Sequence, residues 1–272
     1  MSNQRVVLIT GASSGVGQST AQLLAARGFT VFGTSRNPAV VQRVAGVEML
    51  SLDVTSDASV RACVDDVVGR AGSIDVLINN AGHELAGALE ELSLDEARSQ
   101  FETNFFGVIR MVSAVLPLMR RQKRGHIINV GSLSGLSAIP FLGIYSASKF
   151  ALEGYTEALR HELKPFNIRV SLTEAGFLHT PMMNHRQVGA TSIAEYAPWR
   201  ERAFSAIRAA EEKGPGADAV AEAIVNIVSS PHPRLRYLIG SQAKLVANLR
   251  RFLPAGMFEQ GVRRTFALDG NR

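Results

Sequence analysis

The first 175 residues alternate between two patterns of hydrophobic and polar positions. Short runs rich in β-branched residues predict strands, and longer stretches with apolar residues three and four positions apart predict helices. The predicted strands cover residues 5–10, 29–34, 47–52, 74–79, 126–130 and 168–173, and the clearest helices between them cover residues 15–27 and 58–70. A further helix at 217–229 and a last strand at 235–239 follow.

Strands that alternate with helices indicate a parallel sheet with helices on both faces. The runs are almost continuously apolar, which is typical of strands buried on both sides. Because connections between parallel strands are right-handed, we predict an α/β fold, a single Rossmann-like doubly wound domain with about seven parallel strands. We assign this domain to residues 1–242, including a substrate-loop insertion at 181–216 that should be helical and mobile. Residues 243–272 are assigned to a basic, helical C-terminal tail.

The composition narrows the class of protein. Hydrophobic residues make up 46% and charged residues 19%, which fits a globular protein and excludes disorder and collagen. A net charge of +5 from scattered basic residues suits a phosphate-bearing ligand, and we predict no nucleic-acid partner. The single cysteine, Cys63, allows neither an internal disulfide nor a cysteine cluster, and we predict no metal. Since no long apolar run and no signal peptide are recognisable, we expect a soluble, cytoplasmic protein.

A glycine-rich turn follows the first predicted strand, where residues 10–17 read TGASSGVG. Gly11 permits a tight turn, Gly15 lets the backbone approach a pyrophosphate, and Gly17 lets the next helix pack on the strand. The N-terminus of that helix offers free N–H groups and a positive dipole end to phosphates. An ordinary strand-to-helix turn is the alternative, but the flanking strand and helix favour nucleotide binding. The predicted phosphate-binding residues are Gly11, Ser13, Ser14, Gly15, Val16 and Gly17.

The end of the second strand bears on the choice of cofactor. A free ribose 2′-OH requires a carboxylate at this place, whereas a 2′-phosphate requires a cation. The chain has Ser35 and Arg36 there, which favours NADP(H) over NAD(H), although a solvated surface arginine is the alternative. Asp53 and Val54, at the end of the third strand, are candidates for adenine contact, and Asp53 is equally suited to capping a turn or helix.

Tyr145 and Lys149 lie four residues apart at the start of a predicted helix, and therefore on one face of it. A free tyrosine titrates at about 10. An adjacent ammonium and a cationic nicotinamide should lower that pKa toward the value that general acid–base catalysis requires. By itself the pair is a weak signal, because most such pairs lie on surfaces.

Two further polar residues accompany this pair. Ser132 follows the strand at 126–130, and a hydroxyl at that end of a strand can hydrogen-bond a carbonyl oxygen in the ligand crevice. Ser134 competes for this role. Asn104 lies within a helical pattern, where it either bends the helix or holds a water or a backbone carbonyl.

Taken together, these segments resemble the short-chain dehydrogenase/reductase family. The matching pieces are TGASSGVG at 10–17, NNAG at 79–82, Asn104, Ser132 and YSASK at 145–149. Their order and spacing fit over residues 5–240, and the local sequence is similar to the branch with 17β-hydroxysteroid and retinol dehydrogenases. The resemblance implies a sheet with strand order 3-2-1-4-5-6-7 and a homodimer or homotetramer.

The resemblance also implies roles for the site residues. Tyr145 would be the acid–base residue, Lys149 would bind the nicotinamide ribose, Ser132 would orient the substrate oxygen and Asn104 would hold a relay water. The remaining implied cofactor contacts are Asn80, Ala81 and Gly82 beside the adenine ribose, and Gly176, Phe177 and Thr180 in the loop over the nicotinamide. Family members usually carry Pro-Gly in that loop, where this chain has Ala175 and Gly176, which bears on the stiffness of the loop.

Apolar residues beside the predicted site suggest a substrate class. Met and aromatic side chains suit irregular hydrophobic ligands, although core packing explains each one singly. As a group they predict a lipophilic carbonyl or alcohol that is steroid-, retinoid- or fatty-chain-like. The candidates are Phe141, Leu142, Phe177, Met182, Met183, Tyr196, Trp199 and Phe204, with Ser132 and Tyr145 at the reacting carbon. Arg186 is a candidate clamp for a substrate carboxylate, and His83 and His179 are candidates for the border of the site.

We therefore predict an NADP(H)-dependent oxidoreductase that transfers hydride between the nicotinamide and a carbonyl carbon. A non-catalytic NADP(H)-sensing regulator or scaffold is the alternative, and the intact Asn–Ser–Tyr–Lys set argues against it. An epimerase or dehydratase with a bound cofactor is a third, less favoured function. The tail combines Leu245, Leu249, Phe252 and Leu253 with basic residues. Membrane association through it is the less favoured alternative to packing on the domain or a second subunit.

Overall fold

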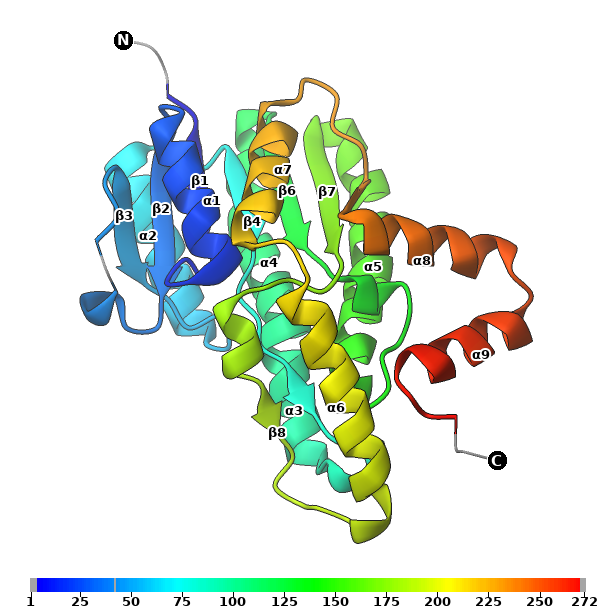
Figure 1. Cartoon of the computed structure of the whole chain (residues 1–272). Coiled ribbons are helices and arrows are strands. Elements are labelled where there is room, and N and C mark those ends of the chain that lie inside the picture. The colour runs from blue at the N-terminus through cyan, green and yellow to red at the C-terminus, as the bar shows by residue number, and fades with distance from the viewer. Residues whose placement is uncertain (1–3, 42, 270–272) are drawn as a thin grey trace.

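A computed structural model of the chain describes residues 4–41 and 43–269 (Figure 1). Seven parallel strands form one sheet in the order β3-β2-β1-β4-β6-β7-β9. The strands are β1 (Val6–Ile9), β2 (Thr30–Ser35), β3 (Val47–Ser51), β4 (Val76–Asn79), β6 (Gly125–Val130), β7 (Ile168–Ala175) and β9 (Arg236–Ile239). The predicted doubly wound α/β fold is confirmed, and so is the strand order that the resemblance implied.

Helices cover both faces of this sheet, as Figure 1 shows. One face carries α2 (Asp57–Ala71), α4 (Gly107–Gln122) and α5 (Gly143–Leu163), and the other carries α1 (Gly15–Ala26) and α7 (Ala217–Ser229). Successive side chains of a strand point to opposite faces. Accordingly Leu8 packs in the core under α2, α4 and α5, whereas Val7 and Ile9 pack in the core under α1 and α7. Burial on both sides explains why the strands are apolar almost without interruption.

A single helical segment runs from α3 (Leu94–Phe101) through a π-helical turn (Glu102–Phe106) into α4. It begins with a capping box, in which Ser93 Oγ accepts the N–H of Glu96 and the Glu96 carboxylate accepts the N–H of Ser93. Within the described residues, Leu94–Gln122 is the one helix long and apolar enough in composition to cross a membrane. Met111, Val115 and Met119 are completely buried against the sheet, so core packing accounts for part of this apolar composition.

The insertion at 181–216 contains a helix, as predicted, but also a short strand that was not predicted. The helix is α6 (Ala197–Glu212), and β8 (Gln187–Val188) pairs in parallel with β5 (Leu85–Ala86). This pairing attaches the insertion to the segment that follows β4, next to the carboxyl ends of the sheet (Figure 1). That the insertion moves stays a prediction.

The basic tail forms two helices, α8 (Ser241–Phe252) and α9 (Ala255–Thr265). In Figure 1, α8 extends away from the sheet and α9 turns back toward α5 and α6. Phe266, just after α9, is buried, and its ring centre lies 6.4 Å from that of Phe177. The end of the tail therefore packs on the domain, while Leu245, Phe252 and Met257 remain exposed.

Candidate active site

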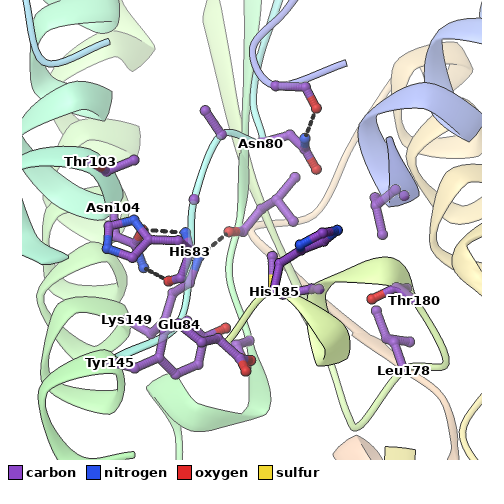
Figure 2. A pocket seen from close by; sticks show the side chains of 18 of the residues that line it. Asn80, His83, Glu84, Thr103, Asn104, Tyr145, Lys149, Leu178, Thr180 and His185 are labelled. Carbon is purple, nitrogen blue, oxygen red and sulfur yellow. Dashed lines mark hydrogen bonds between the residues drawn. The ribbon is translucent and has the colours of Figure 1, made fainter. Parts of the chain in front are cut away.

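A cavity of about 770 Å³ lies at the carboxyl ends of the strands. It extends from the glycine-rich turn before α1 to the start of α5, and Figure 2 shows the side chains around it. Most of the residues predicted for cofactor binding, catalysis or substrate binding line this cavity. The exceptions are Gly17, Phe141, His179, Arg186, Tyr196, Trp199 and Phe204. Residues from Gly11 to Thr180 thus meet at one edge of the sheet, as a doubly wound topology requires.

The turn before α1 has the backbone conformation that its glycines permit. Gly11 and Gly15 have φ values of +68° and +55°, in the left-handed region that favours glycine. A Cβ on Gly17 would lie 2.3 Å from the carbonyl oxygen of Gly11, so Gly17 permits close helix packing and does not line the cavity. Asn80 Nδ2 donates to the carbonyls of Thr10 and Gly11, at 3.0 and 2.9 Å. The NNAG segment thereby holds the turn in place.

The ends of β2 and β3 form the part of the cavity predicted for the adenine ribose. Arg36 is exposed there beside Ser35, and Asp53 and Val54 lie across from them. Asp53 Oδ1 accepts the backbone N–H and the hydroxyl of Thr55, at 2.9 and 2.7 Å. These hydrogen bonds, with a smaller contribution from Arg36, hold the pKa of Asp53 below its ordinary value. Asp53 therefore closes a turn as well as lining the cavity.

Asn104 is buried in the π-helical turn between α3 and α4. Its Nδ2 donates to the carbonyl of His83 at 3.1 Å and to Ser148 Oγ at 3.3 Å, and its Oδ1 accepts the N–H of His83 at 3.0 Å (Figure 2). A π-turn is a frequent way to re-aim a side chain at a functional site. Of the predicted roles for Asn104, holding a backbone carbonyl is confirmed.

Ser132, Tyr145 and Lys149 meet at the centre of the cavity. Lys149 Nζ donates to the carbonyl of Val130 at 2.9 Å and lies 5.8 Å from the centre of the Tyr145 ring. Ser132 follows β6, and its Oγ accepts the N–H of Ser134 at 3.1 Å. Ser134 is itself buried, so Ser132 presents the more accessible hydroxyl of the two.

Burial dominates the acid–base properties of this group. It raises the pKa of Tyr145 well above its ordinary value, and the charge of Glu84 raises that pKa further, while the Ser132 hydroxyl opposes both. Burial also lowers the pKa of Lys149 to about 8. In the protein alone the pKa of Tyr145 is raised, and that Lys149 and a cationic nicotinamide together lower it stays a prediction. The phenol loses its hydration, and the ammonium is directed to the Val130 carbonyl.

A buried ion-pair network borders the substrate side of the cavity and was not predicted. Arg186 Nε donates to Glu84 Oε2 at 2.9 Å, and Arg186 also pairs with Glu211. Because two carboxylates already engage Arg186, its predicted role as a clamp for a substrate carboxylate is wrong. Glu84 and Glu211 both line the cavity, and Figure 2 shows Glu84 beside Tyr145. Glu84 is a charged residue in the apolar run after NNAG, and this could have indicated a buried carboxylate. No local feature of the sequence around Glu211 indicates its role.

The apolar wall of the cavity is smaller than predicted. Leu142, Phe177, Met182 and Met183 line it, but Phe141, Tyr196, Trp199 and Phe204 do not. Phe141 and Phe204 pack edge to face behind the wall, with ring centres 6.3 Å apart. The Tyr196 hydroxyl donates to Glu90, and Trp199 stacks with Arg202. These four aromatic residues hold α6 and its neighbours together instead of contacting the cavity. Of the two histidines considered, His83 lines the cavity and His179 does not.

Comparisons with known proteins agree with this geometry. A sequence model of the short chain dehydrogenase family matches residues 5–189. A 3-ketodihydrosphingosine reductase of Bacteroides thetaiotaomicron is 41% identical, over 97% of this chain and 98% of the relative. Retinol dehydrogenase 8 of Homo sapiens is 38% identical, over 85% of this chain and 80% of the relative.

Solved structures match over the same extent. A short-chain dehydrogenase from Streptomyces avermitilis has a TM-score of 0.82 at 30% identity and covers 99% of both chains. A short chain dehydrogenase/reductase from Burkholderia phymatum, solved in complex with NAD, has a TM-score of 0.79 at 26% identity. It covers 91% of this chain and 93% of its own.

Proposed function

This chain belongs to the short-chain dehydrogenase/reductase family of oxidoreductases acting on CH–OH and C=O groups, and we propose that it transfers hydride between NADP(H) and the carbonyl carbon of a lipophilic substrate. One observation carries the proposal. Ser132, Tyr145 and Lys149 line the same cavity as the glycine-rich turn. A regulator that only senses a dinucleotide needs the turn, but it does not need a buried tyrosine with a lysine one helical turn away.

The residues around the turn fit a dinucleotide. Ser13 and Ser14 are exposed to the cavity at the start of α1, where free N–H groups and the helix dipole favour phosphate. A Cβ on Gly11 would lie 2.9 Å from the Cα of Ala81, so Gly11 lets the turn pack closely on the NNAG segment. When bound, the nicotinamide supplies or accepts the hydride.

The preference for NADP(H) rests on the end of β2. Arg36 is exposed at the cavity, beside Ser35, and forms no ion pair within residues 4–41 and 43–269. A 2′-phosphate is a suitable partner for such a guanidinium, since planar donor pairs match phosphate oxygens. The position that would hold a carboxylate for a free 2′-OH has Ser35 and Arg36 instead.

The chain's own residues provide the proton transfer. Tyr145 is kept protonated by burial, and a phenol in that state donates a proton to a carbonyl oxygen that gains charge. Ser132 hydrogen-bonds the same oxygen and orients it. Lys149 holds the ribose, and Asn104 fixes the backbone beside it and holds the relay water.

The substrate is a lipophilic ketone or secondary alcohol in this proposal. Leu142, Met182 and Met183 supply flexible apolar contacts on the substrate side. The relatives named 3-ketodihydrosphingosine reductase and retinol dehydrogenase 8 support the same class.

The substitution Tyr145→Phe tests the mechanism, because it keeps the ring and removes the proton donor. We expect NADPH oxidation with a lipophilic ketone to fall by roughly 100-fold or more, with NADPH binding retained. Tyr155→Phe is the matched control. Tyr155 lies on the same helix, packs edge to face on Phe105 with ring centres 6.0 Å apart, and does not line the cavity.

Equal turnover of Tyr145→Phe and wild type would exclude this assignment of the proton donor. NADPH binding without turnover of any lipophilic carbonyl by the wild type would favour the regulator.

A further inference from the structure

Two buried carboxylates with one shared ion-pair partner border the substrate side of the cavity. Glu84 and Glu211 both line it, and they share one guanidinium, that of Arg186. All three side chains are almost completely buried. Burying a carboxylate is costly unless its charge and its oxygen atoms find partners. Within the described residues Arg186 is the one ion-pair partner of both carboxylates, and burial raises the pKa of Glu211 in spite of it. The ammonium of Lys149 also lines the cavity, but it donates to the Val130 carbonyl and forms no ion pair with either carboxylate.

One oxygen in this network has no hydrogen-bond donor. Glu211 Oε1 pairs with Arg186, but Glu211 Oε2 is buried and accepts no hydrogen bond from any described part of the chain. The side chain of Glu211 is only 6% exposed. Buried acceptors in folded proteins nearly always have a donor, and the open space next to Glu211 is the cavity. A ligand in the cavity is therefore the natural source of that donor.

Attachment of the insertion does not explain the second carboxylate. A neighbouring pair, Glu91 and Arg200, makes the same kind of attachment with one carboxylate for one arginine. The Glu91 carboxylate also accepts the N–H groups of Ala88 and Ile193, at 2.9 and 2.8 Å. This pair lies outside the cavity. At Arg186, by contrast, the extra carboxylate faces the cavity.

We propose that Glu211 and Glu84 bind a protonated amine of the substrate, on a carbon close to the reacting carbonyl. An ammonium supplies both the missing donor and a further positive charge, whereas a water or a hydroxyl supplies only the donor. Glu84 lies beside Tyr145 in Figure 2, which places the amine near the atom that is reduced. Leu142, Met182 and Met183 receive the apolar part of the same molecule. The inference rests on the proposed function and narrows its substrate to a long-chain amino ketone or amino alcohol.

Three ketones that differ only at nitrogen test this proposal. They are a long-chain α-amino ketone, its N-acetyl amide and the same ketone without nitrogen. We expect wild-type kcat/KM for the amino ketone to exceed that for the other two by about tenfold or more, the range of a charge-assisted hydrogen bond. In Glu211→Gln the ratio of kcat/KM for the amino ketone to kcat/KM for each of the other two ketones should fall about tenfold. Glu84→Gln tests the same subsite if Glu211→Gln does not fold.

Glu91→Gln is the matched control, because it weakens the other attachment of the insertion without touching the cavity. We expect it to change kcat/KM for the three ketones by the same factor and to leave their ratio unchanged. Equal wild-type kcat/KM for the amino ketone and the ketone without nitrogen would overturn the amine subsite. An equal loss of the ratio in Glu91→Gln and Glu211→Gln would overturn it too.

A binding measurement separates this proposal from the proposed function. The long-chain amino alcohol should raise the Tm of the NADP⁺-saturated wild type by more degrees than the alcohol without nitrogen, and Glu211→Gln should abolish the difference. No turnover of any ketone would refute the proposed function but leave this difference in Tm. Equal Tm shifts for both alcohols in the wild type would refute the amine subsite, whether or not the ketones turn over.

Discussion

Glu174, at the end of β7, is completely buried beside a second carboxyl group. Arg236 Nε lies 3.4 Å from Glu174 Oε1 and donates to Glu153 Oε2 at 3.0 Å, so these two carboxyls share a guanidinium that also pairs with the exposed Glu157. Burial, and then the charge of Glu153, raises the pKa of Glu174 to about 8. The folded protein therefore keeps a proton on Glu174 at neutral pH.

This proton links stability to pH. The same carboxyl in the unfolded chain titrates at about 4.3, so the folded state binds more protons than the unfolded state from there up to about pH 8. The free energy of unfolding falls as the pH rises across this window, by at most about 1.4 kcal/mol per pH unit. Between about pH 6 and about pH 8 the loss due to Glu174 amounts to about 2 kcal/mol, since half of the proton remains at pH 8.

Urea unfolding at several pH values, followed by the fluorescence of the single tryptophan Trp199, measures this loss. Glu174→Gln keeps the shape of the side chain but cannot titrate. Between pH 6 and pH 8 the free energy of unfolding of this variant should therefore fall by about 2 kcal/mol less than that of wild type. Glu157→Gln is the control, because Glu157 bonds the same Arg236 at 3.0 Å from an exposed position. Its pH dependence should parallel that of wild type. Identical slopes for wild type and Glu174→Gln would refute the linkage.

Three other substitutions test separate parts of the site. Arg36→Ala should weaken NADPH binding by about 10-fold or more and leave NADH binding unchanged, as measured by ligand-dependent Tm; equal loss for both would contradict the 2′-phosphate contact. Gly17→Ala places a Cβ 2.3 Å from the Gly11 carbonyl oxygen. The free energy of unfolding, measured in urea, should fall by about 1–3 kcal/mol, and NADPH binding should weaken. Stability and NADPH binding equal to those of wild type would contradict the close packing. Phe266→Ala removes a buried ring that packs against Phe177. The free energy of unfolding should fall by about 3 kcal/mol, and KM for a lipophilic ketone should rise. An unchanged KM would mean that the tail does not influence substrate binding.

The strands and the glycine-rich turn were predictable because their causes are local. A strand buried on both faces is apolar at nearly every position, and the sequence shows this directly in β1 and β4. Gly11 and Gly15 adopt positive φ values that other residues disfavour, so the turn also has a local signature. The order of the strands was predicted from the resemblance to a family. Periodicity alone predicts where strands and helices lie along the chain, but not how the strands are arranged in the sheet.

The pairing of β5 with β8 had no such signature. Each strand has two residues, which is too short for any periodicity, and Leu85 lies 187 − 85 = 102 positions before its partner Gln187. The π-helical turn around Asn104 was equally hidden, because the flanking helices keep one continuous apolar pattern. The Glu84–Arg186–Glu211 network depends on the strand pairing, since β5 follows Glu84 and β8 follows Arg186. Long-range pairing of short segments thus decides which charges face the substrate.

The protonation state of Tyr145 follows from the same network. Spacing on a helix placed Lys149 near Tyr145 but could not show that burial and the charge of Glu84 outweigh an ammonium directed to a backbone carbonyl. The protonated phenol is the form that donates a proton in carbonyl reduction, and the deprotonated form is the acceptor in alcohol oxidation. Glu211 also contributes to the raised pKa of Tyr145. An ammonium bound by Glu84 and Glu211 would offset both carboxylate charges and lower the pKa of Tyr145. A cationic substrate would then be oxidised or reduced with a pH dependence shifted to lower pH than that of a neutral one.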